Sequence, residues 1–166
     1  RIQYGTSLFY PAVVMGSHVS ATPNHQTGNI TPIKFRFDMA CAGRLGMELQ
    51  PKQMTDSERQ FARRAIASYK EYRDIVMQGD LYRIGSPYDE DGCYGLAYVS
   101  KDKRRAVVFT YCLLYQSRTV PQFRIRGLDP DTRYTVREMN TEEPRFWFDG
   151  GTFSGELLSR MGLNPK

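Results

Sequence analysis

Residues 55–79 read TDSERQFARRAIASYKEYRDIVMQG and predict one long amphipathic helix from about residue 55 to residue 77. Thr55 and Glu58 form the S/T-x-x-E pattern of a capping box, and Gly79 is a typical stop signal. Apolar side chains recur at spacings of three and four along the segment: Phe61, Ala62, Ala65, Ile66, Tyr69, Tyr72 and Val76. Because such a stripe has to pack against another element, the helix is not expected to stand alone.

The residues before this helix predict alternating strands and helices. Short strands are expected at 12–15 and 44–49, and between them a helix that Thr31 caps and that holds Pro32 in its first turn. This order is typical of a parallel sheet. Since two strands cannot make a covered parallel sheet, we expect residues 1–79 to be a slice of a larger one.

After Gly79 the pattern changes to short aromatic and β-branched runs separated by turns. Turns are expected at 101–104 and at 129–132, where Pro130 restricts the backbone. Strands are expected at 81–84, 94–100, 105–115, 122–126, 133–138 and 146–149. The sequence therefore predicts a second domain over residues 80–166, an antiparallel β-sandwich or curled sheet in which Trp147 is mostly buried.

Charge and hydropathy exclude two classes of partner. The net charge is +5, but the basic residues of the long helix alternate with acidic ones, as on a solvated helix face, so nucleic acid is not expected. No apolar run reaches the length of a membrane span, so no membrane is expected. The chain begins with Arg1, and we expect its true N-terminus to lie upstream, which leaves the compartment open.

The three cysteines, Cys41, Cys93 and Cys112, are far apart in the sequence and match no metal-ligand spacing. An odd number without a spacing pattern favours buried free thiols over a disulfide framework or a zinc site. No metal and no cofactor are expected.

Residues 15–26, MGSHVSATPNHQ, form the most unusual polar segment. They follow an expected strand, and in α/β folds the loops at the carboxyl ends of strands build the binding site. Ser17, His18 and His25 are therefore candidate substrate-binding residues. A Ser/His nucleophile is not favoured, because no G-x-S-x-G elbow or oriented carboxylate accompanies it, and the histidines match no common metal pattern. The plainer interpretation, in which these side chains hydrogen-bond the loop to itself, is favoured for most of them.

The carboxylates offer no catalytic pair. A glycosidase needs two of them across the scissile bond. Of the 18 acidic residues, most lie at expected caps, turns or exposed faces, and only Glu48 stands at a strand end in an apolar setting. No catalytic residue is nominated.

Nearly the whole chain resembles the end of bacterial family 36 α-galactosidases. The resemblance is carried by residues 2–58, which contain IQYGTSL and MGSHVSATPNHQ, by FARRAIASYKEYRDIVMQGDLYRIGSP at 61–87 and by RGLDPDTRYTVREMN at 126–140. It implies an α+β fragment: the last two βα units of a (β/α)8 barrel over residues 1–79, followed by the antiparallel β-domain. Residues 2–9 would end the sixth barrel helix, 11–19 would be the seventh strand and 44–49 the eighth.

The resemblance also implies a function. The family hydrolyses terminal α-galactosides of the raffinose or melibiose type with retention, in the bacterial cytoplasm or periplasm. Its nucleophile and acid/base aspartates lie in motifs that precede IQYGTSL, so the chain is expected to lack both and to be inactive alone. Its partners would be α-galactoside sugars and the missing N-terminal part of its own chain. The loop at 16–26 would face the active-site mouth, with Ser17, His18 and His25 in supporting roles.

Two alternatives concern the remaining surface. The β-domain could be a non-catalytic carbohydrate-binding or structural module, for which Tyr115, Trp147 and Phe148 are candidate sugar contacts. The apolar residues that would normally meet neighbouring barrel strands need cover, either from the β-domain or from a second copy in a homo-oligomer: Leu8, Phe9, Val13, Val14 and Met15.

Overall fold

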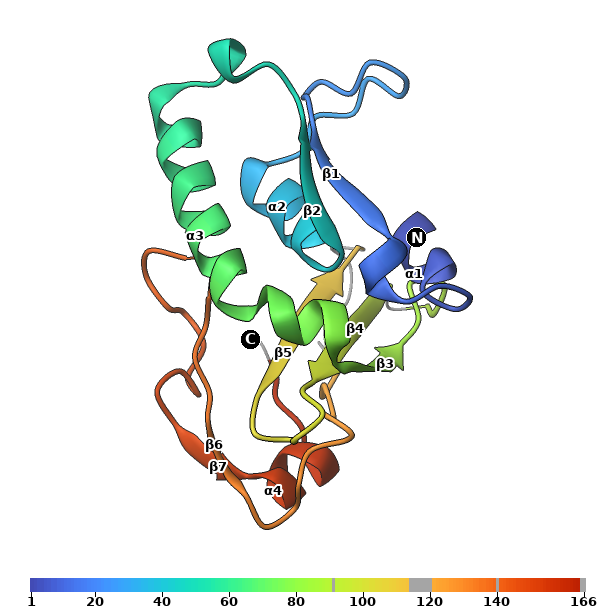
Figure 1. The fold of residues 1–166 in the computed structure, drawn as a ribbon, viewed down its shortest axis with the longest axis vertical. Helices are drawn as coiled ribbons and strands as arrows, with labels where there is room; N and C mark the ends of the chain where they lie inside the picture. Colours follow the sequence, from blue (N-terminus) through green and yellow to red (C-terminus); the bar gives the residue numbers. More distant parts are fainter. Residues whose placement is uncertain (91, 114–120, 140, 165–166) are drawn as a thin grey trace. The chain divides into compact units, whose positions relative to one another are not determined.

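The computed structural model describes residues 1–90, 92–113, 121–139 and 141–164, drawn as a ribbon in Figure 1. It is an α+β structure of two compact units. The N-terminal unit comprises residues 2–77, and the C-terminal unit comprises residues 78–166 together with Arg1.

The N-terminal unit contains a parallel pair of strands with helices around it (Figure 1). Strand β1 (Gly16–Ser20) pairs in parallel with β2 (Arg44–Glu48), in register from Gly16 with Arg44 to Ser20 with Glu48, and helix α2 (Ile33–Cys41) packs against both. The elements in chain order are α1 (Ile2–Thr6), the 3-10 helix η1 (Ala12–Val14), β1 (Gly16–Ser20), α2 (Ile33–Cys41), β2 (Arg44–Glu48), the 3-10 helix η2 (Pro51–Gln53) and α3 (Asp56–Gln78).

Helix α3 confirms the amphipathic segment. The Thr55 backbone N–H donates to Glu58 Oε2 at 3.0 Å, and the Glu58 N–H donates to Thr55 Oγ1 at 3.2 Å, which is the reciprocal geometry of a capping box. The hydrogen bond from the Thr55 backbone is the main cause that lowers the pKa of the Glu58 carboxyl. The buried stripe of α3 consists of Ala62, Ala65, Tyr69, Tyr72, Ile75 and Val76.

Two local predictions in this unit are wrong. Residues 12–14 form the 3-10 helix η1 rather than a strand, closed by Val14 N–H donating to the Pro11 oxygen at 3.1 Å, and the strand starts only at Gly16. Thr31 does not cap α2. The N-cap position falls on Pro32, and the Thr31 carbonyl accepts a hydrogen bond from Arg36 Nε instead.

The C-terminal unit contains an antiparallel sheet in the order β3-β4-β5 and a separate antiparallel pair, β6 with β7. Its elements are β3 (Asp80–Gly85), β4 (Cys93–Val99), β5 (Ala106–Cys112), β6 (Arg133–Thr135), β7 (Thr152–Ser154) and α4 (Gly155–Arg160). Every residue of β4 is buried. The hydrophobic core cluster of the C-terminal unit consists of Ala97, Val99, Ile125, Leu128, Phe148, Leu158 and Leu163.

Several predictions for this unit need correction. Residues 122–126 form only the isolated bridge of Phe123 with Leu163, and residues 155–160 form a helix because the Ser154 side chain accepts from the Leu157 N–H. The expected strand at 146–149 is a turn, closed by Asp149 N–H donating to the Phe146 oxygen at 3.1 Å. This turn puts Phe148 in the core and leaves Trp147 69% exposed, so the prediction of a buried Trp147 is wrong.

The expectation of three free thiols is wrong for two of them. Cys93 and Cys112 are register partners on β4 and β5 and form a disulfide. Hairpin register, which the spacing of the cysteines does not reveal, brings them together. Cys41 is free and buried, as expected. Burial is the main cause that raises the pKa of the Cys41 thiol to about 12, so at neutral pH this thiol is protonated and is not a nucleophile.

Candidate functional site

Strand β1 divides its side chains between a buried and an open side. Ser17 and Val19 are buried, whereas Gly16 and His18 are exposed. Because successive side chains of a strand point to opposite faces, His18 belongs to the open face. In the parallel register His18 lies beside Gly46 and Ser20 lies beside Glu48, so the open face of the pair carries an imidazole, a hydroxyl and a carboxylate.

The His18 ring lies directly over Gly46. A Cβ atom at position 46 would stand 2.9 Å from the ring nitrogen Nε2 of His18 and closer still to its ring carbon Cδ2, so a larger residue would displace the ring. A glycine inside a strand is a signal of such a close approach, and it is the one signal by which sequence reasoning could have found Gly46.

Ser17 lies on the opposite side from His18. Its hydroxyl accepts a hydrogen bond from Gln3 Nε2 in α1, and the residue is 2% exposed. The structure therefore separates two of the three candidate residues. Ser17 joins β1 to α1, whereas His18 is available on the open face.

The loop at 21–32 is organised by hydrogen bonds within itself. Asn24 Oδ1 accepts from the backbone N–H groups of Gln26 and Thr27, each at 3.0 Å. The Asn24 N–H donates to the Asn29 oxygen at 2.9 Å, and the Thr31 N–H donates to Thr22 Oγ1 at 3.1 Å. His25 is exposed on this loop. These bonds agree with the plainer interpretation of the polar segment.

Arg36 of α2 holds both ends of this loop. Its Nη1 donates to the Ser20 oxygen at 2.7 Å, where the loop begins, and its Nε donates to the Thr31 oxygen at 3.0 Å, where the loop ends. Its Nη2 pairs with Glu58 Oε1 at 3.3 Å, in the first turn of α3. The Arg36 side chain is only 11% exposed. Sequence reasoning missed this residue, because no motif marks an arginine whose partners are remote in the chain.

Tyr69 of α3 connects that helix to the start of β2. Its hydroxyl donates to the Gly43 oxygen at 2.9 Å and accepts from the Leu45 N–H at 3.3 Å. Arg36 therefore connects the loop at 21–32 to α2 and α3, and Tyr69 connects α3 to the start of β2.

The open face of β1 and β2 offers groups that can form hydrogen bonds. Glu48 is the one carboxylate on β1 and β2, and hydrolysis of a glycoside by two carboxylates needs a second across the bond. Over the described ranges, no group of three His, Cys, Asp or Glu side chains could hold a metal ion. In the same part of the chain no helix is long and apolar enough to cross a membrane.

Two family models match the chain in succession. The model described as Melibiase matches residues 1–79, and the model of the glycosyl hydrolase family 36 C-terminal domain matches residues 94–166.

Curated relatives are similar to the chain over nearly its whole length. The chain is 36% identical over 164 residues to the bifunctional α-galactosidase/sucrose kinase AgaSK of Mediterraneibacter gnavus, covering 98% of the chain and 16% of that protein. It is 37% identical over 164 residues to α-galactosidase AgaA of Geobacillus stearothermophilus, covering 98% of the chain and 21% of that protein. The chain thus spans about a fifth of the length of these relatives.

Solved structures also match nearly the whole chain. The crystal structure of the GH36 α-galactosidase AgaA from Geobacillus stearothermophilus matches with a TM-score of 0.86 at 34% identity, covering 98% of this chain and 21% of that one. The α-galactosidase from Lactobacillus brevis matches with a TM-score of 0.84 at 37% identity, with the same coverage. Variants of AgaA have been crystallised in complex with stachyose and with raffinose.

Proposed function

Because this chain belongs to glycoside hydrolase family 36, we propose that it supplies the end of a retaining α-galactosidase. In this proposal residues 1–79 are the last two βα units of the catalytic (β/α)8 barrel, and residues 80–166 are the C-terminal domain. The substrates of the whole enzyme would be terminal α-galactosides of the raffinose and melibiose type.

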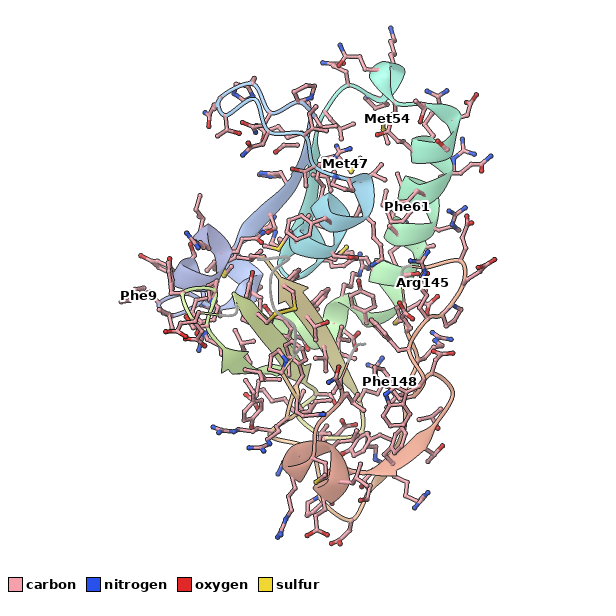
Figure 2. All side chains as sticks on the ribbon, turned by 180° about the vertical axis from the view of Figure 1, so that it is seen from behind. Phe9, Met47, Met54, Phe61, Arg145 and Phe148 are labelled. Atoms are coloured by element: carbon pink, nitrogen blue, oxygen red, sulfur yellow. A yellow bond between two sulfur atoms is a disulfide. The ribbon has the colours of Figure 1, made fainter. Side chains whose placement is uncertain are left out.

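The observation that carries the proposal is an incomplete parallel sheet. Parallel sheets occur almost only with both faces covered and with more than two strands, yet β1 and β2 pair only with each other within the described residues. The apolar side chains beside them are also uncovered: Leu8 is 56%, Phe9 82%, Val13 45% and Val14 61% exposed, and Phe9 points away from the ribbon (Figure 2). Of the five apolar residues that are expected to need cover, Met15 alone is buried. The remaining strands of a barrel would supply the missing cover.

The open face of β1 and β2 is the part of the chain that we assign to the sugar. In a barrel of this kind binding residues gather at the carboxyl ends of the strands, where Ser20 and Glu48 stand. His18 can donate or accept a hydrogen bond with a sugar hydroxyl, and Gly46 leaves room for its ring. Ser17 supports the strand from behind, and His25 lies on the loop that Arg36 holds in place.

The chain alone is expected to show no turnover of p-nitrophenyl α-galactoside above the buffer rate, because it offers no pair of carboxylates at the site. The release of nitrophenol by the purified chain is measured, and the Glu48→Gln variant is the control. Turnover that survives in this variant would contradict the proposal.

A second function is favoured by one observation, the exposure of Trp147. The centroid of its ring lies 5.6 Å from that of Phe148 and 6.3 Å from that of Phe153, both in edge-to-face geometry. These contacts fix an exposed flat ring on the surface of the C-terminal unit. Sugars bind to such rings in carbohydrate-binding modules. Phe148, the second candidate, is buried, and Tyr115 lies outside the described residues. Trp147 is the single tryptophan of the chain, so a saturable change in fluorescence on titration with raffinose would support this function, and its absence would leave a structural role.

A further inference from the structure

We propose that the C-terminal unit carries an oxyanion-binding hollow that takes a small phosphate- or carboxylate-bearing molecule. The hollow has a volume of about 430 Å³ and is lined by Arg83, Ile84, Gly85, Gln122, Arg124 and Arg126. Three of these six residues are arginines and none is acidic. The volume lies within the range of about 300–1,000 Å³ that small-molecule sites occupy.

The backbone under two of the arginines is held in place. The Phe123 N–H donates to the Leu163 oxygen at 2.8 Å, the Leu163 N–H donates back at 3.0 Å, and the Ile125 N–H donates to the Leu158 oxygen at 3.0 Å. Phe123 and Ile125 are 2% and 4% exposed. Since side chains alternate along an extended segment, this burial directs Gln122, Arg124 and Arg126 together to the other side.

The third arginine comes from β3. This strand is at the edge of the β3-β4-β5 sheet, and Arg83, Ile84 and Gly85 are its contribution to the hollow. Next to the hollow, the segment that carries Arg124 and Arg126 contacts β3. There Gly127, with a φ of +85°, lies so close to the ring of Tyr82 that no Cβ atom fits. The arginines are therefore presented by two supported backbones rather than by a free loop.

Two of the three arginines of this hollow, Arg124 and Arg126, are not neutralised by a carboxylate in the described residues. By contrast, Lys101 in the basic turn after β4 forms an ion pair with Asp80 of β3, and the turn itself contains the acidic residue Asp102, whose Oδ1 accepts a hydrogen bond from the Arg104 backbone N–H. Guanidinium groups bind carboxylate and phosphate through two parallel N–H bonds, so an oxyanion between them satisfies both their charge and their donors.

The test uses the whole 166-residue chain and inorganic phosphate as the probe. Citrate is tested as the ligand that bears carboxylates, and galactose is tested as the uncharged control. Arginine Nε–H signals are followed by ¹H–¹⁵N NMR at constant ionic strength. A saturable shift is expected with phosphate or citrate, and the tighter of the two identifies the ligand class. Galactose is expected to shift nothing.

Substitutions locate the binding. The double variant Arg124→Gln/Arg126→Gln is expected to bind the anion at least about fivefold more weakly, because two guanidinium groups are lost. The control Lys103→Gln/Arg104→Gln removes the same charge from the same unit and is expected to bind like the parent chain. Arg124→Lys keeps the charge and should lie between the parent and the double variant. Absence of saturation, an equal loss in both double variants, or an equal response to galactose would overturn the proposal.

Discussion

Replacing Arg36 by Met is expected to lower the free energy of unfolding of the N-terminal unit by about 3 kcal/mol. The variant loses the bonds to the Ser20 and Thr31 oxygens and leaves Glu58 without its cation, and the site is too enclosed for water to replace all three. Urea unfolding followed by circular dichroism measures the loss. Hydrogen exchange in residues 21–32 is expected to accelerate, because both ends of the loop are released.

Lys34→Met is the matched control. It removes the same charge from the same helix. The Lys34 side chain is 49% exposed, and among the described residues its one ion pair is with Asp38, so its loss is expected to cost less than about 1 kcal/mol. Equal destabilisation by the two substitutions would mean that net charge, rather than the position of Arg36, is responsible. Unchanged exchange in the loop of the Arg36 variant would equally contradict its role.

Replacing Phe37 by Ala is expected to have the largest effect on stability, about 4 kcal/mol. Phe37 is 0% exposed and lies on α2, the helix that packs against β1 and β2. Its ring meets Phe61 of α3 edge to face at 5.8 Å, so the substitution removes a contact that joins two helices and leaves a cavity between them. Thermal and urea unfolding of the chain measure the change.

Phe35→Ala on the same helix serves as the comparison. Phe35 is 37% exposed, and the same substitution there is expected to cost about 1 kcal/mol, because little of the ring is taken out of water. If the two alanine variants were equally stable, α2 would not be packed through Phe37 as described.

Sequence patterns predicted the elements whose determinants are local. The capping box of α3 joins residues three positions apart, and the strand at 44–49 is confirmed as β2 within one residue. The strand predicted at 12–15 failed because a β-branched run of this length does not distinguish a strand from the turn of 3-10 helix that follows Pro11.

Contacts between distant residues could not be read in the same way. The Arg36 bonds reach across 16 and 22 positions of sequence to Ser20 and Glu58, and the disulfide depends on the register of a hairpin. Trp147 is expected inside because it stands between Phe146 and Phe148. A turn of four residues instead buries Phe148 in the core and leaves Trp147 exposed.

In the candidate site, too, the sequence pattern identifies the segment but not the contacts of its side chains. The polar character of MGSHVSATPNHQ marked the segment, but the alternation of β1 separates buried Ser17 from exposed His18. His18 and His25 as sugar contacts stay predictions. Helix α2 packs against β1 and β2, and its position determines which side chains of the strands lie on the open face. The spacing of residues in the sequence does not predict that position.

The most direct test of the central claim is a chimaera in which this chain replaces the matching fifth of α-galactosidase AgaA from Geobacillus stearothermophilus. The account predicts that the chimaera hydrolyses p-nitrophenyl α-galactoside and raffinose, whereas AgaA lacking that fifth does not. A chimaera that is folded by circular dichroism and unfolds cooperatively, yet has no more activity than the truncated AgaA, would contradict it.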